Sequence, residues 1–189
     1  MRKVIMFNMV SLDGFFEGQD REIDWHMADE EFNQFAIDQF NSLETILFGR
    51  VTYQLMANFW PSPTALAEDP VVANLMNSTS KIVFSNTLQK ADWNNTRLVS
   101  GDADREIIQL KEQSGKDMII FGSGSLVSSL MRLGLIDEYR LIVNPVVLGS
   151  GRPLFTGLKE RLHLKLLNAL TFKSGNVVLS YQPVEREIK

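Results

Sequence analysis

The chain has 189 residues, of which 44% are hydrophobic and 22% are charged, and its formal net charge is −4 at pH 7. This length suits one domain with its own hydrophobic core, which we expect to span residues 1–189. The negative charge, with no cluster of Lys and Arg, argues against a nucleic-acid-binding protein, and the absence of cysteine excludes disulfides and thiolate metal sites.

The first predicted element is a strand over residues 3–10, which is apolar almost throughout and suits the centre of a sheet covered on both faces. This run is too short to cross a membrane and no cleavage pattern follows it, so we expect a cytoplasmic protein without a membrane partner. Residues 11–18, with Asp13 and two glycines, predict a loop at the end of this central strand, where α/β sheets usually bind their ligands.

A helix is predicted to begin at Asp29-Glu30-Glu31, because acids in the first turn interact favourably with the helix dipole. Its apolar residues recur at helical spacing and should face the core: Phe32, Phe35, Ala36, Phe40 and Leu43. A short strand over 45–48 then leads through Gly49-Arg50-Val51-Thr52 into a helix over 51–58. After a loop predicted at 59–63, Asp69-Pro70 begins another helix, with Asp as N-cap and Pro in the first turn.

Two further strands are predicted at 81–84 and 96–99, the first of which runs into Ser85-Asn86. The next helix, over 103–113, should turn three apolar residues inward: Ile107, Ile108 and Leu110. A fifth strand is predicted to end at Phe121 and to lead through Gly122-Ser123-Gly124-Ser125 into a helix over 126–135. Backbone N–H groups at such a turn favour a phosphate, although ordinary helix capping would use the same residues.

The C-terminal part of the chain changes character after a sixth strand predicted over 138–148. Residues 162–172 and 176–181 are rich in Leu and Val and are separated by a compact turn at 173–175, which predicts a β-hairpin. Helices alternate with strands up to about residue 137. The sequence therefore predicts a three-layer α/β/α fold, with a mostly parallel central sheet and an antiparallel C-terminal hairpin.

Three of the predicted strand ends carry residues suited to binding an anion: Gly49-Arg50-x-Thr52, Ser85-Asn86 and Gly122–Ser125. The carboxyl ends of parallel strands meet at one edge, so these segments can face one extended ligand such as a dinucleotide. The usual Rossmann fingerprint is absent, because Val127 stands where its third glycine would be and the motif follows the fifth strand. No metal site is predicted, because the only histidines, His26 and His163, lack ligand spacing.

This set of motifs resembles the dihydrofolate reductase-like superfamily, and within it the branch that contains the C-terminal reductase domain of bifunctional riboflavin-biosynthesis proteins. The resemblance runs nearly end to end and rests on five segments: Ser11-Leu12-Asp13-Gly14, Gly49-Arg50-Val51-Thr52, Gly122-Ser123-Gly124-Ser125-Leu126, residues 133–138 and residues 145–155. It implies a dihydrofolate reductase-like fold, NADPH as the hydride donor, a small heterocyclic substrate and a homodimer.

The resemblance also implies a set of site residues. The pyrophosphate would lie on Gly122–Leu126 and the nicotinamide at the end of the first strand; the residues implied to contact cofactor are Val10, Trp25, Gly49, Arg50, Thr52, Ser85, Asn86, Gly122, Ser123, Gly124, Ser125 and Leu126. Those implied to contact substrate are Ser11, Asp13, Leu148, Gly149, Gly151 and Arg152. Residues 148–152 would also help to form the dimer.

Reduction requires a proton as well as a hydride, and two acids, Asp13 and Glu30, are candidate catalytic donors. Asp13 could instead cap its own loop. Glu30 stands five residues after Trp25, the spacing of tryptophan and acid in dihydrofolate reductases, but it could instead serve the helix dipole.

The sequence departs from the resembled families at the substrate side. Riboflavin-branch reductases hold a ribose phosphate with basic residues, one of them on the first helix, whereas residues 27–49 contain no Lys or Arg. Dihydrofolate reductases have a proline before the position of Trp25, where this chain has Asp24. Three functions therefore remain open: a reductase resembling 5-amino-6-(5-phosphoribosylamino)uracil reductase, a dihydrofolate or pterin reductase, and a non-catalytic NADP-binding dimer.

Overall fold

The computed structural model describes residues 1–184, so residues 185–189 of the predicted domain lie outside the described part. Within it, eight strands form the main sheet: β1 (Val4–Ser11), β3 (Leu43–Gly49), β4 (Ser80–Phe84), β5 (Thr96–Val99), β6 (Asp117–Phe121), β7 (Glu138–Asn144), β9 (Leu164–Thr171) and β10 (Val177–Pro183). Their order is β5-β4-β3-β6-β1-β7-β10-β9. The strands from β5 to β7 are parallel, and the β10–β9 hairpin continues the sheet in antiparallel fashion.

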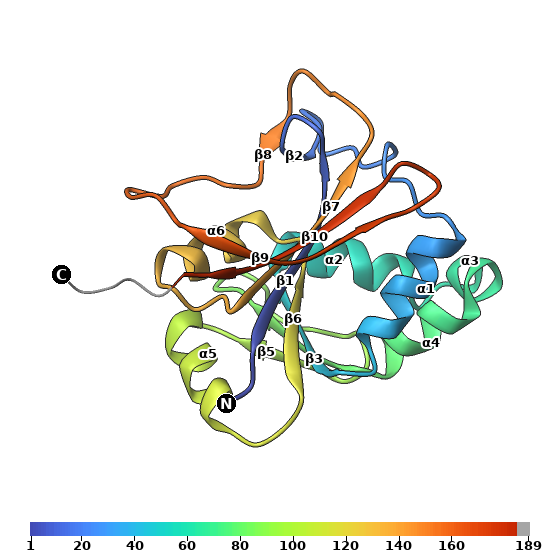
Figure 1. Cartoon of the computed structure of the whole chain (residues 1–189). Coiled ribbons are helices and arrows are strands. Elements are labelled where there is room, and N and C mark those ends of the chain that lie inside the picture. The colour runs from blue at the N-terminus through green and yellow to red at the C-terminus, as the bar shows by residue number, and fades with distance from the viewer. Residues whose placement is uncertain (185–189) are drawn as a thin grey trace.

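Helices cover both faces of this sheet (Figure 1). The helices are α1 (Glu30–Gln39), α2 (Arg50–Phe59), α3 (Pro63–Glu68), α4 (Pro70–Ser78), α5 (Ala103–Glu112) and α6 (Gly124–Arg132). Side chains of α5 and α6 pack on one face, while those of α1, α2 and α4 pack on the other. None of these helices is long and apolar enough to cross a membrane, as far as residues 1–184 are concerned.

The position of strand β1 explains why its sequence is apolar almost throughout. Val4 and Met6 belong to the core under α5 and α6, whereas Ile5 and Phe7 belong to the core under α1 and α4. Because side chains of a strand alternate between the two faces, a central strand of this sheet buries every position. The predicted fold, a mostly parallel α/β sheet with an antiparallel C-terminal hairpin, is confirmed.

Several element predictions were wrong. A sixth helix, α3, begins at the last residue of the predicted loop and fills residues 63–68, for which no element was predicted. Ser62 caps it by accepting a hydrogen bond from Ala65 N, and Pro63 opens its first turn. The predicted helical stripe continued to Leu43, but α1 ends at Gln39 and Leu43 begins β3. Ile108, predicted to face inward, is exposed on α5.

The segments around β1 and β7 also differ from the prediction. Strand β7 ends at Asn144 and does not continue to residue 148, because Pro145 has no N–H to donate to a neighbouring strand. The predicted loop over residues 11–18 contains the short strand β2 (Phe15–Glu17), which pairs with β8 (Arg152–Pro153) in a separate sheet. This small sheet lies beyond the ends of β1 and β7 (Figure 1).

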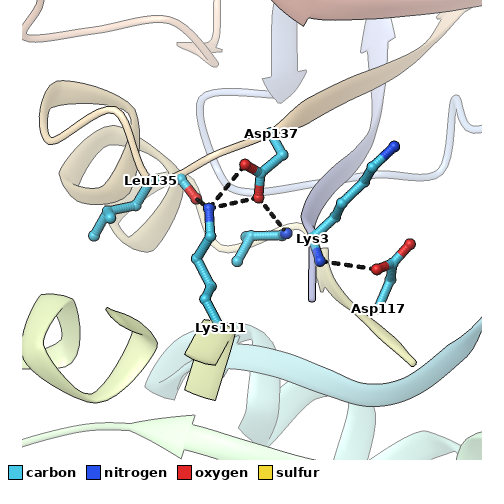
Figure 2. Close-up of polar contacts among 6 residues, drawn as sticks. Lys3, Lys111, Asp117, Leu135 and Asp137 are labelled. Carbon is cyan, nitrogen blue, oxygen red and sulfur yellow. Dashed lines mark hydrogen bonds and ion pairs between the residues drawn. The ribbon is translucent and has the colours of Figure 1, made fainter. Parts of the chain in front are cut away.

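Carboxylates hold the amino-terminal edge of the main sheet together (Figure 2). Asp137 accepts hydrogen bonds from Val4 N at 2.8 Å and from Lys111 Nζ at 2.6 and 2.8 Å. Asp117 accepts from Lys3 N at 2.8 Å. These contacts fix β1, β6 and β7 relative to one another at the edge opposite to the one that carries the predicted ligand-binding segments.

Candidate functional site

The predicted ligand-binding segments meet at the carboxyl edge of the sheet, where β1, β3, β4 and β6 end. Two hollows lie there. One is a groove of about 280 Å³ between the starts of α2 and α6, lined by Gly49, Arg50, Val51, Phe84, Ser125 and Leu126. The other is a larger apolar cavity of about 320 Å³ beneath α1, α2 and α4.

Hydrogen bonds join the two helix starts that form the groove. Gly49 N donates to Ser123 Oγ at 2.8 Å, and Ser123 N donates to Thr52 Oγ1 at 3.0 Å. Gly122 and Ser123 both have left-handed backbone conformations, with φ of +64° and +62°. These two residues turn the chain sharply from β6 into α6 and hold that turn against the start of α2.

The first turns of α2 and α6 keep their backbone donors free of side-chain caps. Asp29, Ser62 and Asp69 each accept a hydrogen bond from the start of their own helices, α1, α3 and α4. By contrast, neither Gly49 nor Ser123 caps its helix with a side chain. Unpaired N–H groups at a helix N-terminus, together with the helix dipole, favour an anion. The groove therefore has the chemistry that a phosphate group requires.

Arg50 supplies a positive charge at the groove. It is the first residue of α2, its side chain is exposed, and its Nη1 donates to Gln54 Oε1 at 3.0 Å. Gly49 is in register with Phe84 of β4, so Ser85 follows directly beside the groove. The polar side chains of Ser85 and Asn86 already bind the local backbone: Ser85 Oγ accepts from Leu88 N at 2.9 Å and Asn86 Oδ1 from Gly101 N at 2.7 Å.

Thr52 faces the cavity instead of the groove, and it lines the cavity together with Gly122 and Ser123. The β6–α6 turn thus separates the two hollows: the following residues, Ser125 and Leu126, line the groove. An extended ligand that crossed this turn would place its anionic part in the groove and its apolar part in the cavity.

The cavity is mainly aromatic and aliphatic, with walls from β1, α1, α2 and α4 that include Phe7, Phe32, Phe40, Met56, Trp60 and Phe121. Its titratable lining residues are Glu17, His26 and Asp69. Within residues 1–184, no Lys or Arg lines it. Asn8 also lines the cavity; its side chain is only 4% exposed, and its Oδ1 has no hydrogen-bond partner among the described residues.

His26 is an uncharged polar group of the cavity. Burial lowers its pKa from 6.5 to about 4, against a smaller opposing effect of a hydrogen bond with the backbone of Phe16. Its Nε2 is buried and has no partner within the described part of the chain. Trp25, the predicted nicotinamide contact, packs edge-on against the His26 ring with ring centroids 4.4 Å apart.

Two buried asparagines hold the segment that carries Trp25 and His26 on the sheet. Asn144 Oδ1 accepts from Met27 N at 2.9 Å, and Asn176 Nδ2 donates to Met27 O at 2.8 Å. Both asparagines are fully buried, although they come from β7 and from the hairpin turn before β10. The position of His26 at the cavity is therefore fixed by side chains more than a hundred residues away in sequence.

Asp13 caps a loop and is poorly suited to donate a proton. Its carboxylate accepts from Ser11 Oγ at 2.7 Å, from Gly149 N at 2.8 Å and from Leu148 N at 3.2 Å. These hydrogen bonds, that of Ser11 above all, lower the pKa of Asp13 below 3.8. The structure thus brings together four of the predicted substrate residues, but it gives Asp13 the capping role that the sequence left open.

The other predicted proton donor also lies away from the cavity. Glu30 is exposed in the first turn of α1 and is not among the described cavity-lining residues. Acids in the first turn of a helix interact favourably with the helix dipole, and this interaction accounts for Glu30 at its position.

Arg152 and Gly151 hold the β2–β8 sheet. Arg152 Nη1 lies 2.5 Å from Glu17 Oε1, so the predicted substrate cation is already paired with a carboxylate. Gly151 lies against β2, where an added Cβ would approach Glu17 O to 2.6 Å. Val10 is buried in the core, so its side chain is turned away from solvent.

Five polar residues that line the cavity were not identified from the sequence: Asn8, Glu17, His26, Asn33 and Asp69. One available signal was Asn8, a polar residue in the middle of an otherwise apolar central strand. Such a residue requires a partner once it is buried. Glu17 and His26 lie in segments without regular periodicity, so no sequence pattern indicates which way their side chains point.

Comparisons with known proteins agree with this architecture. The sequence model of a family described as the RibD C-terminal domain matches residues 2–178. The uncharacterized protein YyaP of Bacillus subtilis (strain 168) is 37% identical over 180 residues, which are 95% of this chain and 94% of YyaP.

Two solved structures share the fold at low identity. A diaminohydroxyphosphoribosylaminopyrimidine deaminase/5-amino-6-(5-phosphoribosylamino)uracil reductase from Thermotoga maritima matches with a TM-score of 0.69 and 14% identity, over 97% of this chain and 57% of that one. A dihydrofolate reductase from Enterococcus faecalis, complexed with NADP(H), matches with a TM-score of 0.66 and 12% identity, over 97% of both chains.

Proposed function

Because the chain belongs to the RibD C-terminal domain family, we propose that it is an NADPH-dependent reductase that transfers hydride to a small heterocyclic substrate. One observation carries the proposal: an anion-binding groove and an apolar cavity lie on the two sides of the β6–α6 turn. A dinucleotide combines charged phosphates with an uncharged nicotinamide ring, so its two parts match the two hollows.

The groove residues would hold the phosphates. The free N–H groups at the start of α6, the Ser125 hydroxyl and the exposed Arg50 guanidinium together offer donors and a positive charge. Ser123 and Thr52 would act indirectly, because their hydroxyls accept backbone hydrogen bonds that hold the turn in place. NADPH, when bound, supplies the hydride.

The cavity residues would orient the substrate and exclude water. The aromatic walls formed by Phe7, Phe32 and Phe121 favour a flat ring, and a dry site keeps the reacting atoms in one arrangement. Since Asp13 and Glu30 lie elsewhere, His26 and Glu17 are the groups that could hold a water through which a proton reaches the substrate.

A pterin or folate reductase is the second candidate function. It is supported by the likeness to a dihydrofolate reductase over nearly the whole chain, and by a cavity in which no described residue carries a positive charge. The third candidate function is an NADP-binding protein without catalysis, which would bind the cofactor phosphates in the groove and would need no substrate in the cavity.

The experiment that distinguishes these functions follows the loss of NADPH absorbance with three additions: 5-amino-6-(5-phosphoribosylamino)uracil, a dihydropterin, and buffer. Consumption of NADPH with either compound, above the buffer rate, supports a reductase and identifies the class of acceptor. NADPH binding by calorimetry without consumption in either reaction would contradict the enzyme and support the non-catalytic protein.

We also propose that the protein forms a homodimer through the edge strand β9. Its outer edge has no strand partner within residues 1–184, and three leucines on it are largely exposed: Leu166, Leu167 and Leu170. An exposed apolar edge strand favours pairing with another chain. Light scattering should report a dimer that Leu167→Lys converts to a monomer, whereas a monomeric wild-type protein would contradict the proposal.

A further inference from the structure

We infer that the cavity binds an uncharged, planar heterocycle that carries N–H or O–H donors and no phosphate group. This inference rests on the proposed reductase function and concerns the substrate of the same cavity. It differs from the phosphorylated substrate named for the Thermotoga maritima reductase of the same fold.

The charges around the cavity argue against a phosphate. Its lining residues in the described part of the chain include the acids Glu17 and Asp69 but neither Lys nor Arg. A phosphate dianion moved from water into this environment would lose its hydration without gaining a cation.

The two arginines among the predicted site residues do not line the cavity. Arg152 belongs to strand β8 of the small sheet, and its charge is paired with Glu17 at 2.5 Å. Arg50 lies in the separate groove, where the phosphates of the cofactor are proposed to bind. Neither of them lines the apolar cavity.

Two unpartnered atoms indicate what the ligand must supply. Asn8 Oδ1 is buried without a hydrogen-bond partner, and so is His26 Nε2, and both residues line the cavity. A buried polar atom without a partner is unfavourable, so it marks a place where a ligand can donate a hydrogen bond. Since His26 is uncharged, its Nε2 can accept such a bond if the other ring nitrogen holds the proton.

The volume and the lining of the cavity restrict the size and the shape of the ligand. A volume of about 320 Å³ is at the small end of the range for ligand pockets, roughly 300–1,000 Å³, and the aromatic walls favour a flat ring. An amino- or oxo-substituted ring system with N–H groups meets these requirements, whereas a sugar phosphate does not.

The test compares one compound with and without its phosphate. Calorimetry on the NADP⁺-loaded protein should show that dephosphorylated 5-amino-6-(5-phosphoribosylamino)uracil binds at least about tenfold more tightly than the phosphorylated form. Equal or tighter binding of the phosphorylated form would overturn the inference, and so would the absence of binding by both forms.

A charge-gain variant with a matched control makes the test sharper. Asn33 lines the cavity from α1, while its neighbour Gln34 is exposed on the same helix. Asn33→Lys should improve binding of the phosphorylated form by about tenfold, whereas Gln34→Lys should leave it unchanged. Equal effects of the two variants would show that the cavity does not determine phosphate affinity and would overturn the inference.

The failure of this inference can be told apart from the failure of the proposed function. Preferential binding of the dephosphorylated compound without NADPH consumption would support the inference and contradict the reductase. Consumption of NADPH with a preference for the phosphorylated compound would support the reductase and overturn the inference.

Discussion

The backbone N–H of Gly49 donates a 2.8 Å hydrogen bond to the hydroxyl of Ser123, which lies 74 residues further along the chain. This bond joins the end of β3, where Gly49 lines the groove, to the start of α6, where Ser123 lines the apolar cavity. The proposed function depends on this junction, because one ligand must extend across it.

Removal of the Ser123 hydroxyl should weaken both the fold and cofactor binding. Ser123→Ala leaves the buried Gly49 N–H without an acceptor, which should lower the free energy of unfolding by about 1–3 kcal/mol in urea titrations. Ser123→Gly also loses the hydroxyl but relieves the left-handed φ of +62°, so it should be the more stable of the two by about 1 kcal/mol. A Ser123→Ala protein as stable as wild type would show that the bond contributes nothing.

Gly122 should tolerate a side chain less well than Gly134 does. Both have similar left-handed conformations, with φ of +64° and +67°, so alanine should cost each about 1–2 kcal/mol of stability. At Gly122 the new Cβ would also lie 3.2 Å from Thr52 Cγ2, whereas nothing lies within 4 Å at Gly134. We expect Gly122→Ala to weaken NADPH binding by about tenfold and Gly134→Ala to leave it unchanged. Equal Kd values of Gly122→Ala and Gly134→Ala in calorimetry would show that the Gly122 turn does not contribute to cofactor binding.

The fold was predictable from the sequence where local pattern determines structure. The continuous apolar runs of β1 and β6, the glycine turn after Phe121 and the compact hairpin turn at 173–175 were each sufficient to predict an element. Helix α3 was missed because Pro61 and Pro63 at its start are typical of a loop, although Ser62 and Pro63 are also good helix-start residues.

The candidate site was less predictable, because its cavity depends on long-range contacts. The groove residues follow strand ends and could be found by position, whereas His26 reaches the cavity only because Asn144 and Asn176 hold Met27. For Asp13 the sequence left two roles open, and only the hydrogen bonds from the loop at Leu148 and Gly149 distinguish them.

Asp13→Asn should reduce stability in a pH-dependent way. The folded-state pKa of Asp13 lies below 3.8, so its ionised form stabilises the protein above about pH 4, and this contribution disappears as the pH falls through the folded value. The urea midpoints of wild type and Asp13→Asn should therefore differ at pH 7 and converge once the pH falls below the folded-state pKa of Asp13. Asp20→Asn, an exposed acid of the following loop, should show no such difference.

The same Asp13→Asn variant also tests the catalytic role. Because Asp13 is engaged in capping, the variant should retain kcat within a few-fold, with the change confined to stability and KM. A loss of about 100-fold or more in kcat would contradict this expectation and support Asp13 as the proton donor.

His26 should make stability fall in mildly acidic solution. Its pKa is about 4 in the folded protein against 6.5 for an unburied histidine, so the unfolded chain binds the proton first. The contribution of His26 to the free energy of unfolding should therefore be complete above about pH 6.5. It should decrease as the pH falls toward 4, by at most about 1.4 kcal/mol per pH unit. His26→Gln should remove this slope, and His163→Gln, at the exposed histidine, should keep it. An unchanged slope in His26→Gln would show that His26 is not buried as a neutral ring.

The most direct test of the proposed cofactor site is the calorimetric titration of NADPH into wild type, Arg50→Ala and Arg105→Ala. Arg50 lines the groove, whereas Arg105 is an exposed arginine near the start of α5. We expect that wild type binds NADPH, that Arg50→Ala weakens this binding by about tenfold, and that Arg105→Ala leaves it unchanged. An Arg50→Ala protein with wild-type affinity, or a wild-type protein that does not bind NADPH, would contradict the proposed site.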